Sequence, residues 1–118
     1  MILLVEDHEV TRRTYARLLV MRGYKVIEAA DGAAAVSLLD RYDFDLVITD
    51  LAMPKLTGFG LLSLMRVKWP KVPVILITGY LSPAVANTIL RYNVQFLSKP
   101  VDPNKLISTV EGVTSPPH

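Results

Sequence analysis

Residues 46–54 read Leu46-Val47-Ile48-Thr49-Asp50-Leu51-Ala52-Met53-Pro54, a short apolar run that ends in one carboxylate and is followed by a turn signal. An apolar run of this length, bounded by turn residues, is typical of a strand buried on both faces of a sheet. Asp50 would then lie at the carboxyl end of its strand, the edge where open α/β sheets bind ligands. An isolated acid there is more often a helix cap, so the role of Asp50 depends on the rest of the chain.

The composition indicates one globular domain. The chain has 118 residues, of which 51% are apolar and 20% charged, and this balance excludes a disordered chain. It has no cysteine, which excludes disulfides and thiolate metal sites. No apolar run approaches the roughly 20 residues of a membrane helix, and residues 1–5 lack the basic leader of a signal peptide.

The net charge is only +2, but four arginines share one expected helix: Arg12, Arg13, Arg17 and Arg22. They could form a nucleic-acid patch or a solvated helix face. Neither aromatic interleaving nor a recognition motif accompanies them, so the solvated face is favoured and no direct nucleic-acid partner is expected.

Apolar runs predict strands at residues 2–5, 25–29, 46–50, 73–78 and 95–98. Amphipathic spacing predicts helices at about 9–22, from 31 onward, at 58–68, at 82–92 and from 102 to about 113. Asp31, Ser82 and Asp102 are the expected caps, and Gly23 is placed to end the first helix. Val10 and Ala33 are expected to face the core.

Strands and helices alternate five times, which predicts an α/β fold. We expect a doubly wound five-stranded parallel sheet in the flavodoxin-like (βα)5 arrangement, with strand order 2-1-3-4-5. In that order the first and third strands are neighbours, and the switch point lies between them.

Polar side chains follow four of these strands at the same expected edge of the sheet. Glu6 and Asp7 follow the first strand, Asp50 ends the third, Thr78 ends the fourth and Lys99 follows the fifth. Each alone has an ordinary structural explanation as a cap, a packed residue or a solvated charge. Together they converge on one place in this fold.

The residue types at this place suit phosphoryl transfer. Carboxylates at one switch point repel one another unless a cation joins them, and oxygen-only ligands suit Mg²⁺ or Mn²⁺. An ionised Asp50 could act as a nucleophile toward phosphorus. The Lys99 ammonium and the Thr78 hydroxyl could then hold phosphoryl oxygens.

The combined pattern resembles the receiver domain of two-component response regulators. The matching stretches are Val5-Glu6-Asp7, Asp50-Leu51-Ala52-Met53-Pro54, Thr78-Gly79 and Lys99-Pro100. The resemblance extends from the first strand to Val113, so residues 1–113 would form the receiver domain and residues 114–118 a tail or the start of an interdomain linker.

The resemblance implies that Asp50 accepts a phosphoryl group from a histidine kinase or a histidine phosphotransfer protein. It implies a magnesium site made of Glu6, Asp7, Asp50 and the backbone carbonyl of Ala52, with Thr78 and Lys99 contacting the phosphate. Such a domain is a cytoplasmic signalling module that catalyses its own phosphorylation and dephosphorylation, and it is not a turnover enzyme. A cis Lys99-Pro100 bond is also expected.

The same resemblance gives Thr78 and Phe96 the role of a two-state switch, in which the ring moves inward when the hydroxyl binds the phosphate. The alternative for Phe96 is a permanently buried core ring. The output surface would be formed by the fourth helix, the fifth strand and the fifth helix, and it would contact an output domain, an effector or a second copy. The candidate contacts there are Leu81, Ile89, Tyr92 and Lys105.

Two variable positions predict a long-lived phosphoryl group. Ala52 cannot orient a water molecule, and Tyr80 is bulky enough to shield an acyl phosphate. Slow self-dephosphorylation is therefore expected.

Other classes remain as alternatives. A flavodoxin-like FMN carrier needs a phosphate cradle after the first strand, where this chain has Glu6-Asp7-His8-Glu9. A hydrolase that turns over an aspartyl phosphate would need a substrate-selecting insertion. A phosphorylation-independent pseudo-receiver, acting as a protein-interaction module, is a further alternative. The parent protein could be a transcription regulator, a hybrid kinase or a free-standing receiver.

Overall fold

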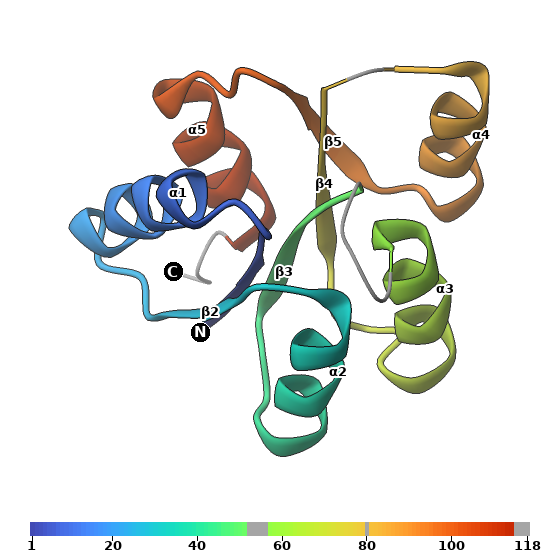
Figure 1. The fold of residues 1–118 in the computed structure, drawn as a ribbon, viewed down its shortest axis with the longest axis horizontal. Coiled ribbons are helices and arrows are strands. Elements are labelled where there is room, and N and C mark those ends of the chain that lie inside the picture. The colour runs from blue at the N-terminus through green and yellow to red at the C-terminus, as the bar shows by residue number, and fades with distance from the viewer. Residues whose placement is uncertain (52–56, 80, 115–118) are drawn as a thin grey trace.

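A computed structural model describes residues 1–51, 57–79 and 81–114. Five parallel strands form one sheet in the order β2-β1-β3-β4-β5, and a helix follows each strand (Figure 1). The elements are β1 (Ile2–Val5), α1 (Glu9–Met21), β2 (Val26–Ala29), α2 (Gly32–Arg41), β3 (Leu46–Asp50), α3 (Gly58–Lys68), β4 (Val74–Thr78), α4 (Pro83–Tyr92), β5 (Gln95–Ser98) and α5 (Pro103–Thr114). The predicted fold and strand order are confirmed. The longest described helix, α1, has 13 residues, and none of the described helices is long and apolar enough to cross a membrane.

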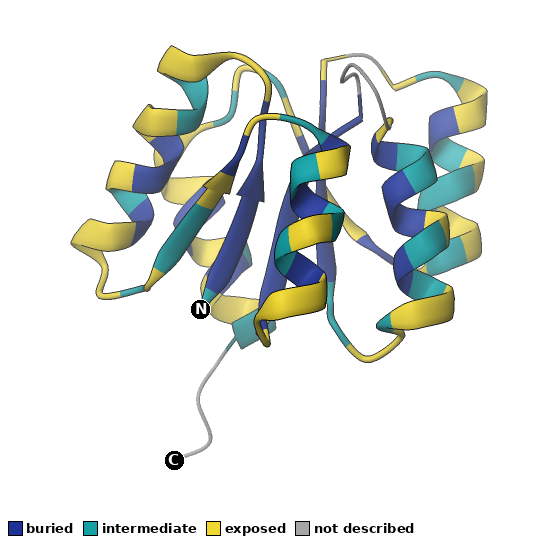
Figure 2. Ribbon diagram, turned by 60° about the horizontal axis from the view of Figure 1, so that its bottom comes forward, coloured by how far each residue is buried: buried dark blue, intermediate teal, exposed yellow. Residues whose placement is uncertain are grey.

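Helices cover both faces of the sheet, with α1 and α5 on one side and α2, α3 and α4 on the other (Figure 1). Alternate residues of each central strand enter different cores. On β1, Leu3 and Val5 pack with α2 and α3, whereas Ile2 and Leu4 pack with α1 and α5. This two-sided burial explains why the strands read as continuous apolar runs, and Figure 2 shows the central strands buried along their length.

Most helices begin at a side-chain cap. The side chains of His8, Asp31, Thr57 and Ser82 accept hydrogen bonds from the backbone N–H groups three residues later. The Asp102 carboxylate accepts from the N–H of Asn104 at 2.8 Å, beside the start of α5. The caps expected at Asp31 and Ser82 are confirmed. Because His8 caps α1 and Thr57 caps α3, neither Glu6 nor Asp50 is needed as a helix cap.

Two expected core residues are exposed. Val10 is 70% exposed, and the buried stripe of α1 consists of Tyr15, Ala16 and Leu19. Ala33 is also exposed, and Ala35 takes its place in the core. A helix turns by about 100° per residue, so Val10 lies about 140° around the helix from Tyr15 and cannot share its face. Ala33 lies about 200° around α2 from Ala35, so it cannot share the buried face either.

Candidate functional site

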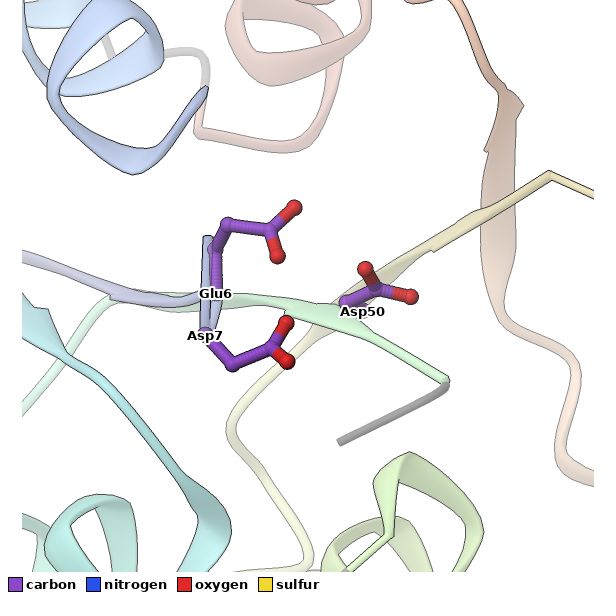
Figure 3. Close-up of side chains that lie close together, drawn as sticks. All are labelled: Glu6, Asp7 and Asp50. Carbon is purple, nitrogen blue, oxygen red and sulfur yellow. The ribbon is translucent and has the colours of Figure 1, made fainter. Parts of the chain in front are cut away.

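The switch point of the sheet brings three carboxylates together. Asp50 is the last residue of β3 and is 4% exposed, and Glu6 follows β1 and is 1% exposed. These strands are neighbours, with Val5 opposite Thr49, so Glu6 and Asp7 emerge beside Asp50. One carboxylate oxygen from each acid lies within 4.8 Å of the others, and Figure 3 shows the Glu6 and Asp7 carboxylates extending toward Asp50. Asp7 is exposed, so the cluster opens to solvent on that side.

Lys99 follows β5, which lies two strands away from β3, and its side chain reaches the cluster. Its Nζ donates a hydrogen bond to Oδ2 of Asp50 and lies 3.3 Å from Oε1 of Glu6. The backbone N–H of Lys99 donates to the carbonyl of Thr78 at 2.8 Å, which fixes the start of the loop after β5 against β4. The Lys99-Pro100 peptide bond is cis, as expected.

The charges of the cluster perturb one another. Burial raises the pKa of the Glu6 carboxyl above its ordinary value, and the nearby Asp7 and Asp50 act in the same direction. Burial alone would lower the pKa of Lys99, but its bond to Asp50 and the charges of Asp50 and Glu6 outweigh this and raise it. Lys99 is therefore a firmly protonated partner for the acids. One ammonium does not balance the carboxylates, so the site keeps an excess of negative charge.

The cluster has the donor set of a hard divalent cation. Its potential ligand atoms are carboxylate oxygens from Glu6, Asp7 and Asp50, a type that Mg²⁺ prefers. Oε2 of Glu6 accepts from the His8 N–H at 3.2 Å, whereas its buried Oε1 lies 3.3 Å from the Lys99 ammonium but accepts no hydrogen bond from the described residues. Native proteins rarely leave a buried carboxylate oxygen without a hydrogen bond. The residues therefore fit a bound metal ion.

Thr78 lies at the same edge, as the last residue of β4, and is 5% exposed. A hollow of about 440 Å³ opens beside it, lined by Asp50, Leu51, Phe59, Thr78, Gly79, Val85 and Lys99. The three polar residues predicted to handle a phosphoryl group thus line one surface depression.

Phe96 lies on β5 and is 39% exposed, so it is not a buried core ring in this structure. Leu81 and Lys105 are exposed, whereas Ile89 and Tyr92 are half-buried and pack against the core. The other predicted residues, Ala52 and Tyr80, lie outside the described residues.

The sequence analysis missed two residues that contact the backbone beside the site. Arg12 was expected on a solvated face, but its side chain is 13% exposed and bonded to the loop that carries the acids. Gly58 lies so close to β3 that a β-carbon there would be 2.4 Å from the backbone oxygen of Asp50. Arg12 was not recognised because it is one of several arginines in α1. No local sequence signal marks Gly58.

Residues 2–111, nearly all of the chain, match the family described as "Response regulator receiver domain". The chain belongs to this family. It is 34% identical over 117 residues to "Probable transcriptional regulator ycf29" of Porphyra purpurea, a match that covers 95% of the chain and 55% of that relative. It is 34% identical over 113 residues to "Sensor kinase CckA" of Brucella abortus, covering 93% of the chain and 12% of the kinase.

A solved receiver has the same fold. The signal receiver domain of an HD domain-containing protein from Pseudomonas fluorescens superimposes with a TM-score of 0.91 at 28% identity, and the match covers 97% of this chain and 93% of that one. By contrast, the chain spans about half the length, or less, of the curated relatives named above. The shared unit is therefore the receiver domain, within proteins of different overall architecture.

Proposed function

We propose that this receiver accepts a phosphoryl group on Asp50 from the phosphohistidine of a histidine kinase or a histidine phosphotransfer protein. One observation carries the proposal: a buried aspartate at the end of β3 is bonded to Lys99 and lies within 4.8 Å of an acidic pair. The likeness of the chain to both a transcriptional regulator and a sensor kinase supports a role in a phosphorelay. The reaction would take place in the cytoplasm, as the family resemblance implies.

In the proposed reaction a carboxylate oxygen of Asp50 bonds to phosphorus as the bond from phosphorus to the imidazole nitrogen breaks. The electron pair of that bond stays on the imidazole. The transferred group spreads its charge over its outer oxygens, so catalysis consists mainly of positioning and charge compensation. Lys99 would pair with one oxygen, and the Thr78 hydroxyl would donate to another. The same residues would hold the acyl phosphate until water removes the group.

Glu6, Asp7 and Asp50 would hold Mg²⁺, or Mn²⁺ in its place, together with the backbone carbonyl of Ala52 that the family resemblance assigns. When bound, the ion supplies Lewis-acid stabilisation of the charge on the transferred group. The residues themselves place Asp50 between Lys99 and the acidic pair. Mass spectrometry of the protein incubated with Mg²⁺ and acetyl phosphate tests the proposal, since one added phosphoryl group is expected, and none with EDTA.

Replacing Asp7 by Asn should weaken Mg²⁺ binding without unfolding the protein. One charge lost a few ångströms from a divalent cation is worth more than the ~1.4 kcal/mol that a tenfold change requires, so we expect the Kd to rise at least about tenfold. Asp7 is exposed, and its loss relieves repulsion within the cluster, so the metal-free protein should be no less stable. Isothermal titration calorimetry and urea unfolding in EDTA measure the two quantities. An unchanged Kd would remove Asp7 from the metal site.

The proposed output is a shift between two conformations in which Thr78 and Phe96 move together. The exposed ring of Phe96 is consistent with an outward position that the switch could leave. The partner would be an output domain, an effector or a second copy of this chain, contacted through α4, β5 and α5. The exposed side chains on these elements include Leu90 and Lys105, and Leu81 is exposed just before α4. Residues beyond α5 would lead into a linker.

The phosphoryl group on Asp50 should be long-lived, because Ala52 offers no polar group to orient water and Tyr80 is large. We expect Ala52→Asn and Tyr80→Ala each to shorten the half-life after the donor is removed. Phosphoprotein gels or intact mass against time give the decay. A wild-type half-life as short as that of the fastest receivers would contradict the prediction.

A phosphorylation-independent interaction module is not favoured, because Glu6, Asp7, Asp50, Thr78 and Lys99 all line the same edge of the sheet. That alternative would become the better explanation if the chain neither bound Mg²⁺ nor gained mass from any donor.

A further inference from the structure

We propose that Arg12 is a positioning residue, which orients the Glu6-Asp7 peptide and thereby aims the acidic pair at the metal ion. The inference rests on the proposed function, because it concerns the affinity of the proposed metal site. Arg12 lies in the first turns of α1 and is separated from the acids by one loop.

The guanidinium of Arg12 joins two segments that flank the site. Its Nη1 donates to the backbone carbonyl of Glu6 at 3.0 Å, and its Nε donates to Oε1 of Glu28 on β2 at 3.1 Å. The planar guanidinium holds both bonds in one rigid geometry. Arg12 therefore ties the carbonyl between the two acids to the neighbouring strand.

The neighbouring Arg13 shows that this arrangement is particular to Arg12. Only 13% of the Arg12 side chain is exposed, whereas 68% of the Arg13 side chain is. Arg13 reaches only Glu9, one turn away, at 3.6 Å, and that pair is exposed at both ends. A largely buried guanidinium needs its partners, whereas an exposed pair of this kind contributes little.

The remaining contacts of Glu6 indicate what Arg12 adds. The Glu6 N–H donates to the Ala29 carbonyl at 3.1 Å, and the Glu6 carboxylate accepts from the His8 N–H. The hydrogen bond from Arg12 to the Glu6 carbonyl fixes the plane of the peptide that leads into Asp7. Because Asp7 is exposed, packing does not hold it, and its direction follows from that peptide plane. Groups that orient metal ligands in this way typically change metal affinity by about 10–100-fold.

The test compares Mg²⁺ dissociation constants measured by isothermal titration calorimetry for Arg12→Gln, Arg12→Lys and Arg13→Gln. We expect Arg12→Gln to raise the Kd about tenfold or more. Arg12→Lys keeps the positive charge but loses the planar fork, so it should also raise the Kd. Arg13→Gln removes the same charge from the same helix and should leave the Kd within about twofold of wild type.

Urea unfolding in EDTA distinguishes a positioning role of Arg12 from a role in the stability of the fold alone. If Arg12→Gln lowered the free energy of unfolding but left the Kd of the folded protein unchanged, the inference would be overturned. It would also be overturned if Arg12→Lys bound Mg²⁺ like wild type, because the planar fork would then not matter, or if Arg13→Gln weakened binding as much, because the effect would then not be particular to Arg12. Wild-type protein that bound no Mg²⁺ would instead overturn the proposed metal site itself, and the inference with it.

Discussion

Asp50→Asn is expected to abolish phosphoryl incorporation from acetyl phosphate. The substitution keeps the shape of the side chain but replaces the nucleophilic carboxylate oxygen by a neutral amide. It also removes the charge that faces Nζ of Lys99. Intact mass spectrometry after incubation with Mg²⁺ should show one added phosphoryl group on wild-type protein and none on the variant.

A matched control is the exposed Asp43, which lies between α2 and β3 at the opposite edge of the sheet. Asp43→Asn makes the same chemical change and should leave phosphorylation as in wild type. Circular dichroism should show that both variants are folded. If Asp50→Asn still gained a phosphoryl group, the acceptor would be another residue, and the assignment of Asp50 would be wrong.

The sequence sufficed for the fold because the three central strands, β1, β3 and β4, are buried on both faces. The run Val74 to Ile77 is fully apolar, and its alternate residues enter two different cores. Turn signals such as Ser82-Pro83 then divided the chain into units. The order of the strands followed from the right-handed crossover rule, which leaves few topologies for five βα units. The same order brought Glu6, Asp7 and Asp50 to one place.

The sequence does not show how each helix is rotated about its axis. It also does not show which segments distant in the chain come into contact. Apolar spacing did not exclude Val10, which lies in the first turn of α1 and points away from the buried stripe. Arg12 resembles its neighbour Arg13 in sequence, and the three-dimensional positions of Glu28 and of the Glu6 carbonyl distinguish them. Such contacts depend on tertiary structure and have no local pattern.

Gly58 is the clearest case, because its importance depends on the backbone of β3. Its N–H donates to the Leu51 carbonyl at 3.1 Å, which holds the start of α3 against the strand that carries Asp50. A β-carbon at Gly58 would lie 2.4 Å from the backbone oxygen of Asp50 and 2.7 Å from Cα of Leu51. Both obstacles are backbone atoms, so no side-chain rotation can relieve the clash.

Gly58→Ala should therefore lower the free energy of unfolding by about 1–3 kcal/mol, the usual cost of overpacking, although alanine is favoured over glycine in helices by about 1 kcal/mol. Gly112→Ala is the matched control, because it lies within α5 and a β-carbon there meets nothing within 4 Å. The control should gain up to about 1 kcal/mol from the helix preference alone. Urea unfolding, followed by the fluorescence of the single Trp69, measures both variants.

The two glycine variants also report on the site. Since β3 or α3 must shift to admit the new methyl group, the Gly58→Ala molecules that remain folded should be phosphorylated more slowly at saturating Mg²⁺. Gly112→Ala should be phosphorylated at the wild-type rate. A Gly58→Ala protein as stable and as reactive as wild type would mean that the close approach of α3 to β3 is not what holds Asp50 in place. The position of Asp50 would then depend on its bond to Lys99 and on the β-sheet alone.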